Sequence, residues 1–290
     1  MKCKQLLRVA LSLVFFSCEI SISPALKTPS HITIESEGLT TTAVTVENHL
    51  GNKKTSEFIY GEACNVVFNN MKGFIATENL VYPEMDIYVI NKKGDTLLNE
   101  QNLLKNQDIN FQKEKLSLES YILIAKPMFA GNEYLMHVNI TDTKSDHFYN
   151  IRMPFSVIEN PLFTTKSSGI TYDSMYLYSK QRDVGIVDDK ISMEEDIYII
   201  LNNFKGLKVD ENGMVDITSS LSLKDATGTK IIEKENMSPA LLNAASVQQQ
   251  FSPYIVITSG IVTNPITCEL KVKDNRSDAF FETRFELIVE

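Results

Sequence analysis

The segment Phe68-Asn-Asn-Met-Lys-Gly-Phe74 returns later in the chain as Leu201-Asn-Asn-Phe-Lys-Gly-Leu207, at an offset of 133 residues. Three further matches follow in the same order at offsets of 132 to 134: Asp86–Leu98 with Ser220–Ile232, Tyr121–Ile124 with Tyr254–Ile257, and Asp142–Phe148 with Asp274–Phe280. Ordered matches at a nearly constant offset predict a duplicated domain, because the offset is the size of one domain and far exceeds a solenoid repeat.

Both halves show short runs of alternating apolar and polar residues, broken by Gly, Asn, Asp and Pro, which is the pattern of half-buried strands. About seven antiparallel strands per half predict an all-β protein with two tandem immunoglobulin-like β-sandwich domains from an internal duplication. A jelly roll is the alternative. The expected strands lie near 43–47, 63–69, 80–90, 95–98, 121–126, 133–141 and 147–158, and near 174–178, 196–202, 215–224, 229–233, 253–259, 265–273 and 279–289.

The duplication assigns residues 31–160 to the first repeat and 161–290 to the second. Asn160-Pro161 marks the boundary, because proline stops the last strand of the first repeat. Almost no spacer follows, so we expect the two sandwiches to be linked semi-rigidly, end to end.

Two segments, 99–117 and 234–251, are polar and lack alternation, and they are expected to be long connections at the ends of the sandwiches. In the second segment, Ser238 followed by Pro239 predicts the start of a helix of one or two turns.

The N-terminus predicts export. Residues 1–17 contain Lys2, Lys4 and Arg8 before a short apolar run, as in a signal peptide. Cys18 follows Ser17, and this arrangement looks like a bacterial lipoprotein signal in which Cys18 becomes lipidated. Residues 18–30 are then the lipidated cysteine and a tether to the first sandwich. The alternative is ordinary cleavage after Ala25, which discards Cys18.

The chain is acidic, with 28 basic and 37 acidic residues and a net charge of −9. Removal of residues 1–17 takes away three basic residues and leaves 25 − 37 = −12. An acidic surface repels phosphate backbones, so we expect no nucleic-acid partner. The apolar run of the signal peptide is too short to span a bilayer, and no other run approaches the roughly 18 residues needed, so we expect contact with the membrane through the lipid anchor alone.

After processing, Cys64 and Cys268 remain besides Cys18. Both fall in the inward rows of predicted strands in different repeats, so we interpret them as buried free thiols. A structural disulfide is the alternative, which export would permit.

No histidines are spaced like metal ligands, and His137 aligns with Glu269 at an expected exposed strand position. Asp142 and Asp146, repeated as Asp274 and Asp278, are the candidates for a calcium site, although aspartates that cap their own turns produce the same pattern. The repeated Asn-Asn-x-Lys-Gly element is interpreted as a turn rather than a binding motif.

The sequence contains no nucleophile elbow, phosphate loop, dinucleotide fingerprint or Cys-x-x-Cys, so we expect no enzymatic activity and no cofactor. The mature chain resembles the tandem immunoglobulin-like exported lipoproteins of Bacteroidetes-type bacteria, in its Cys18 signal and its sandwich repeats rich in Tyr, Phe, Asn and Lys. The resemblance implies a cell-envelope protein that faces the periplasm or the exterior. The signal for surface export has several acids directly after the cysteine, and here Glu19 alone is acidic.

Two function classes follow. The first is a non-enzymatic interaction or scaffold module whose partner is another envelope protein. The second is a carbohydrate-binding lipoprotein, in which exposed aromatics such as Tyr172, Tyr176 and Tyr178 stack on a glycan. The absence of Trp weighs against the second, since sugar-binding surfaces favour it.

Overall fold

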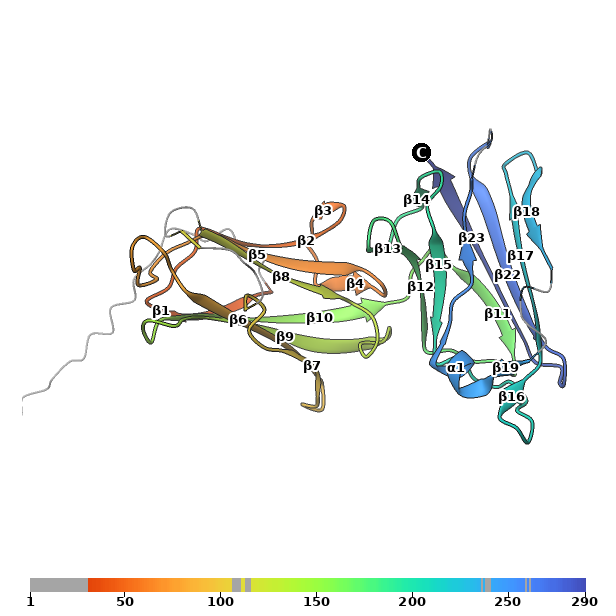
Figure 1. The fold of residues 1–290 in the computed structure, drawn as a ribbon, viewed down its shortest axis with the longest axis horizontal. Helices are drawn as coiled ribbons and strands as arrows, with labels where there is room; N and C mark the ends of the chain where they lie inside the picture. The colour runs from red at the N-terminus through yellow and green to blue at the C-terminus, as the bar shows by residue number, and fades with distance from the viewer. Residues whose placement is uncertain are drawn as a thin grey trace, which may run out of the picture.

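The computed structural model describes residues 31–105, 111–112, 116–235, 237, 241–258, 260 and 262–290. Cys18, the predicted signal peptide and the tether lie outside these residues, as do Ser238 and Pro239. The described residues form two β-sandwiches, which follow each other along the chain (Figure 1).

The first sandwich has two facing sheets. Its strands are β1 (Thr33–Glu37), β2 (Ala43–Asn48), β3 (Gly51–Asn52), β4 (Glu57–Ile59), β5 (Ala63–Met71), β6 (Pro83–Asn91), β7 (Thr96–Glu100), β8 (Leu116–Leu123), β9 (Asn132–Asp142) and β10 (Phe148–Ile158). One sheet has the order β1-β10-β9-β6-β7, with β4 also on β10, and the other has the order β3-β2-β5-β8.

The second sandwich repeats this plan. Its elements are β11 (Thr164–Ser168), β12 (Ser174–Ser179), β13 (Val184–Ile186), β14 (Lys190–Ile191), β15 (Ile197–Asn202), β16 (Met214–Val215), β17 (Ile217–Lys224), β18 (Lys230–Lys234), β19 (Leu242–Asn243), α1 (Ala244–Gln249), β20 (Gln250–Phe251), β21 (Tyr254–Ile255), β22 (Ile266–Asp274) and β23 (Phe280–Val289). One sheet has the order β11-β23-β22-β17-β18, with β14 on β23, and the other has the order β13-β12-β15-β20, with β21 on β15.

Equivalent residues of the two sandwiches have equivalent partners. Tyr121 pairs with Asn65, and Tyr254 pairs with Tyr198 at the corresponding place. The immunoglobulin-like fold class expected from the sequence is confirmed. The strands are not all antiparallel, because β4 runs parallel to β10 and β14 parallel to β23.

Alternation explains the two cores. In β9 the inward row is Tyr134, Met136, Val138 and Ile140, and in β22 it is Ile266, Cys268, Leu270 and Val272, all buried. The Tyr134 hydroxyl accepts from the Phe129 N–H at 2.7 Å and donates to the Phe129 carbonyl at 3.0 Å. A tyrosine near the start of this strand that bonds back to the preceding loop is a mark of immunoglobulin-like sandwiches.

Some predicted boundaries were wrong. The strand expected at 121–126 begins earlier, at Leu116, and the described residues of the strand expected at 253–259 form a shorter strand, Tyr254–Ile255. The helix begins after Asn243, whose side chain caps it by accepting from the Ser246 N–H, instead of after Ser238.

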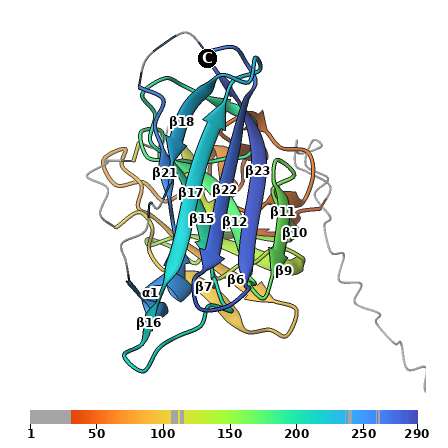
Figure 2. The same cartoon turned by 90° about the vertical axis from the view of Figure 1, so that its right-hand side faces the viewer.

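The arrangement of the sandwiches also differs from the expected end-to-end link. The end of the first sandwich packs against the outer face of the sheet that contains β12 and β15 (Figures 1 and 2). Tyr176 and Ile200 from that face belong to the hydrophobic core of the first sandwich. The outer face of this sheet is therefore partly covered by the other sandwich.

Candidate functional site

The junction between the sandwiches is centred on two aromatic rings. Tyr60 of the first sandwich is fully buried and meets Tyr176 of the second edge to face, with ring centroids 5.5 Å apart. The ring of Phe129 stacks on that of Tyr60, with centroids 6.2 Å apart. Burial raises the pKa of both tyrosines, to about 12 for Tyr176, so both hydroxyls stay protonated at neutral pH.

Buried polar groups fix the two sandwiches in register. The Tyr60 hydroxyl accepts from the Lys126 N–H at 3.0 Å and from Asn202 Nδ2 at 2.9 Å. The Ser174 hydroxyl accepts from the Ala130 N–H at 3.1 Å. Because unpaired buried polar groups cost free energy, these bonds favour this one arrangement of the sandwiches.

Glycine permits the closest approach at the junction. A Cβ atom on Gly185 would lie 1.7 Å from the Gly61 carbonyl oxygen, and one on Gly61 would lie 2.5 Å from the Tyr176 side chain. Asn160, at the predicted boundary, is buried and donates to the Ile186 carbonyl at 3.0 Å. The linker is therefore bonded to the second sandwich.

Four tyrosines lie beside this junction, and we call them the junctional tyrosine surface: Tyr121, Tyr178, Tyr198 and Tyr254. Tyr178 pairs with Tyr198, and Tyr198 pairs with Tyr254, so three of them form a row across β12, β15 and β21. Their neighbours Leu177 and Ile197 point into the core, which places the row on the outer face.

Tyr121 brings the first sandwich into the same surface. Burial raises its pKa, and the charge of Asp183 in the second sandwich raises it further. Asp183 accepts a hydrogen bond from the Tyr178 hydroxyl, and this bond raises the Tyr178 pKa to about 12. Tyr121 and Tyr254 are 53% and 50% exposed, so the surface is accessible to a partner.

The sequence contains a signal for this surface in its duplication. Tyr121 and Tyr254 occupy equivalent positions 133 residues apart, each directly before a buried isoleucine. The expectation that Tyr172, Tyr176 and Tyr178 are exposed aromatic side chains is wrong. Tyr176 is buried at the junction, Tyr172 packs against Phe281 at 5.3 Å, and Tyr178 alone belongs to the surface.

A buried carboxylate that is paired with a cation occurs at equivalent positions of the two sandwiches. Glu62 accepts from Lys53 Nζ at 2.9 Å and from the Ile59 N–H at 2.8 Å. Its counterpart Glu195 accepts from Arg182 Nε and from the Ser179 hydroxyl. Each carboxylate has a cation and further donors, which is the environment of a structural brace rather than of a general acid.

His49 and Asp188 face each other across the junction, with His49 Nε2 and Asp188 Oδ1 3.9 Å apart. Within the described chain, neither of these atoms has a hydrogen-bond partner. Burial lowers the pKa of His49, while the charge of Asp188 opposes this shift.

The candidate calcium ligands are placed in turns. Asp142 is buried and accepts from the Ile75 N–H at 2.9 Å and the Ser145 hydroxyl at 2.7 Å. Asp274 is buried in the same way and accepts from the Lys208 N–H and the Ser277 hydroxyl.

Burial alone would raise the Asp274 pKa, but these hydrogen bonds outweigh it and lower the pKa. Asp146 and Asp278 are exposed. Among the residues that the structure describes, no three His, Cys, Asp or Glu side chains are grouped to hold a metal ion.

The Asn-Asn-x-Lys-Gly elements lie at the ends of strands: Asn69 and Asn70 belong to β5, where the register shifts before Met71, and Asn202 ends β15. Asn70 and Asn203 have φ values of 51° and 55°, and a Cβ on Gly73 or Gly206 would lie 1.9 Å from a carbonyl oxygen.

The expectation for the thiols is confirmed, since Cys64 and Cys268 are buried and free. His137 was wrongly expected to be exposed, because it is half-buried and stacks on Tyr88 at 4.3 Å.

The described part of the chain contains no helix with the length and apolarity needed to cross a membrane. No protein family model and no curated protein matches the sequence.

Solved structures that resemble the fold include a β-glucuronidase of Bacteroides uniformis, at 7% identity and a TM-score of 0.27, covering 77% of this chain and 26% of that chain. Another is a DUF3823 family protein from Bacteroides ovatus, at 10% identity and a TM-score of 0.21, covering 75% of this chain and 92% of that chain. The chain thus spans about a quarter of the glucuronidase it matches. Likeness of this degree assigns neither a family nor an activity, so function is argued from the chain's own residues.

Proposed function

We propose that the protein is a non-enzymatic cell-envelope lipoprotein that acts as an interaction or scaffold module, and that another envelope protein docks on the junctional tyrosine surface. The observation that carries this proposal is the row Tyr178, Tyr198 and Tyr254 on the outer face of the second sandwich beside the junction. Tyrosine is enriched at the centres of protein interfaces, because it offers a large rigid contact area at a low entropic cost.

The junction supports the same proposal. Buried hydrogen bonds and the contact between Gly61 and Gly185 hold the two sandwiches in one arrangement before any partner binds. A surface that is already formed requires no ordering on binding, which favours affinity. A scaffold module needs this property, since it must hold its partners at a fixed geometry.

Site-specific photo-cross-linking in the intact cell tests the docking surface. A benzoylphenylalanine at position 121 or 254 is expected to give the same discrete adduct, and Tyr198→Ser is expected to reduce it. Position 82 is the matched control, because Tyr82 is 41% exposed and lies outside this surface. Equal adducts from position 82, or none from 121 and 254, would contradict the proposal.

The alternative is carbohydrate binding at the same surface, favoured by the exposed rings of Tyr121 and Tyr254. Affinity electrophoresis in gels that contain envelope polysaccharides separates the two functions. A protein-docking surface predicts unchanged mobility, whereas a glycan site predicts retardation that Tyr254→Ser abolishes while Tyr82→Ser does not.

The lipid anchor is part of the proposal and rests on Cys18, outside the described residues. Several acyl chains on one cysteine give lasting anchorage. Cys18→Ala is therefore expected to move the protein from the membrane fraction to the soluble fraction. Sedimentation of Cys18→Ala with membranes, or release of the wild type, would contradict it.

A further inference from the structure

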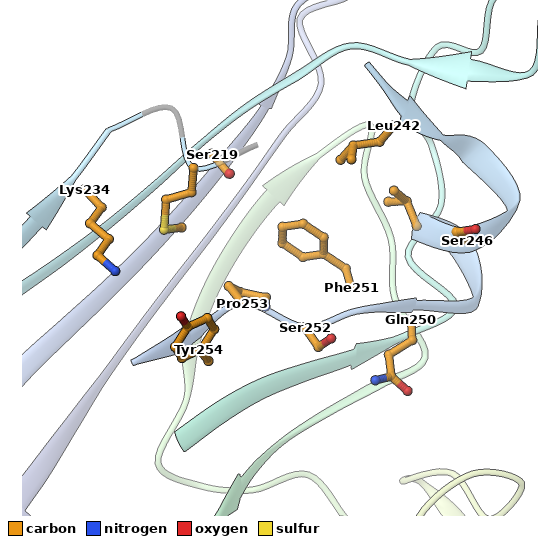
Figure 3. A pocket seen from close by; sticks show the side chains of 11 residues that line it. Ser219, Lys234, Leu242, Ser246, Gln250, Phe251, Ser252, Pro253 and Tyr254 are labelled. Carbon is orange, nitrogen blue, oxygen red and sulfur yellow. The ribbon is translucent and has the colours of Figure 1, made fainter. Parts of the chain in front are cut away.

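An open apolar pocket of about 500 Å³ lies in the second sandwich (Figure 3). It forms where β17 and β18 face β20, β21 and α1. The lining residues are Ser219, Lys234, Met237, Leu242, Ser246, Val247, Gln250, Phe251, Ser252, Pro253 and Tyr254. A volume of this size is typical of sites for small molecules.

A comparison of the two repeats shows one reason for the pocket. Ser219 in β17 lies in an inward row with Ile217, Leu221 and Leu223. Its counterpart in β6 is Met85. The backbone hydrogen bonds show this equivalence, because the Leu103 N–H donates to the Met85 carbonyl and the Met237 N–H donates to the Ser219 carbonyl. Met85 is fully buried, so the first core is filled at the position where the second has a small side chain.

The strand across the pocket gives a second reason. In the first sandwich, β8 is continuous over Leu116–Leu123 and pairs with β5. In the second, Ser252-Pro253 separates β20 from β21, so this edge is interrupted beside the pocket. Proline cannot donate to a ladder, which accounts for the break.

The charge at the pocket is also specific to the second repeat. In the second repeat, Lys234 lies opposite Leu221 on the neighbouring strand. In the first repeat the equivalent of Leu221 is Ile87, and Glu100 lies opposite it. Lys234 is the one charged residue among the described lining residues, and its ammonium lies 5.8 Å from the centre of the Tyr254 ring. The neighbouring Lys230, by contrast, is paired with Glu233.

We propose that this pocket binds a small amphipathic anion, with an aliphatic chain among Met237, Val247 and Phe251 and a carboxylate at Lys234. An apolar floor favours a chain without polar groups, and a cation at the mouth favours a single negative charge. Hydroxyl and amide groups of Ser246, Ser252 and Gln250 line the pocket as well and can bond to the head group. The pocket shares Tyr254 with the junctional tyrosine surface, but binding of a small anion does not require the docking partner, so the two proposals are tested independently.

The absence of tryptophan from the chain allows a clean test, because one introduced Trp is the sole indole reporter. In the full chain carrying Tyr254→Trp, titration with dodecanoate below its micellar concentration is expected to give a saturable blue shift. The matched reporter Tyr121→Trp, at the equivalent place in the first repeat, is expected to give none.

Two further variants in the Tyr254→Trp background test the assigned roles. Lys234→Gln is expected to weaken dodecanoate about fivefold and leave neutral dodecanol unchanged, as for loss of one partly exposed ion pair. Lys230→Gln is its control and should change neither. Ser219→Met is expected to abolish binding of both ligands by filling the pocket as Met85 fills the first core, whereas Ser220→Met on the outward row should not.

Several results would overturn the proposal: no saturable blue shift in Tyr254→Trp, an equal blue shift in Tyr121→Trp, or an equal loss of affinity for dodecanoate in Lys234→Gln and Lys230→Gln. Full binding by a folded Ser219→Met variant, with an unchanged melting temperature, would overturn it too. If Ser219→Met does not fold, the Lys234→Gln variant still tests the proposal, because Lys234 is exposed and its replacement should weaken dodecanoate binding but not dodecanol binding.

Discussion

The Asn202 side chain of the second sandwich donates a hydrogen bond of 2.9 Å to the Tyr60 hydroxyl of the first, and both side chains are buried. The same hydroxyl accepts from the Lys126 N–H, so one oxygen atom ties the loop after β8 to β15 across the junction. The bond lies within an apolar environment that includes Tyr176 and Ile200, where loss of a partner is costly because water does not replace it.

Tyr60→Phe is therefore expected to destabilise the protein by about 1–3 kcal/mol, since it leaves the buried Asn202 amide and the partly buried Lys126 N–H without their acceptor. Urea unfolding followed by far-UV circular dichroism measures the change. Tyr149→Phe is the matched control, because the Tyr149 hydroxyl is buried but has no hydrogen-bond partner among the described residues. It should stay within about 0.5 kcal/mol of wild type. Equal effects of the two variants would contradict the role of Tyr60.

Gly185→Ala is expected to loosen the junction. The new Cβ would lie 1.7 Å from the Gly61 carbonyl oxygen, so the two backbones must separate. Overpacking of this kind costs about 1–3 kcal/mol. Small-angle scattering should show a larger radius of gyration, and hydrogen exchange should rise at Tyr60–Glu62 and Ser174–Leu177.

Gly213→Ala is the control for that experiment. Gly213 has a positive φ of 75° but open space around its Cβ position, so alanine there costs about 1–2 kcal/mol of local strain. Its radius of gyration should remain that of wild type. A Gly185→Ala protein with unchanged scattering and exchange would show that the junction tolerates the contact.

The fold class could be predicted because β-strands with one buried face record that face as alternation, and because the chain contains the pattern twice. The short strands β4 and β14 could not be predicted, since elements of two or three residues show no period. Their parallel pairing with the last strand depends on tertiary contacts alone.

The packing of one sandwich on the face of the other did leave a trace. Ile197-Tyr-Ile-Ile-Leu201 is continuously apolar, which is typical of a strand covered on both faces. The short linker at Asn160-Pro161 limits the distance between the sandwiches but does not determine which face of the second one the first covers. The pocket could not be predicted, since a single Ser219 in an inward row indicates a cavity only when its neighbours are known.

The thiols of Cys64 and Cys268 are expected to be unreactive in the folded protein. Burial raises the pKa of both, so the reactive thiolate is scarce. Iodoacetamide at pH 8 followed by peptide mapping should label them only after unfolding. Cys64→Val and Cys268→Val should each change stability by about 1 kcal/mol, because they keep an apolar side chain of similar volume. Rapid labelling of the native protein would contradict their burial.

Glu195 is expected to make the second sandwich sensitive to acid. Burial alone would raise its pKa, but hydrogen bonds from Ser179 and Ser192, together with Arg182, lower it below the usual 4.5. A carboxylate with a depressed pKa stabilises the fold above its unfolded pKa, and this contribution is lost as the pH falls through the folded pKa. Stability should therefore decline below about pH 4.5.

Glu195→Gln separates this effect from general acid unfolding. The variant should be less stable than wild type by about 1–3 kcal/mol at pH 7, because a buried acceptor of charge-assisted bonds is lost. Below pH 4.5 the gap to wild type should narrow, since wild-type Glu195 becomes neutral as well. Glu233→Gln, which removes an exposed partner of Lys230, should show neither change. Urea unfolding at pH 7.0, 5.0 and 3.5 measures all three proteins, and a gap that stays constant with pH would show that Glu195 does not titrate in the folded state.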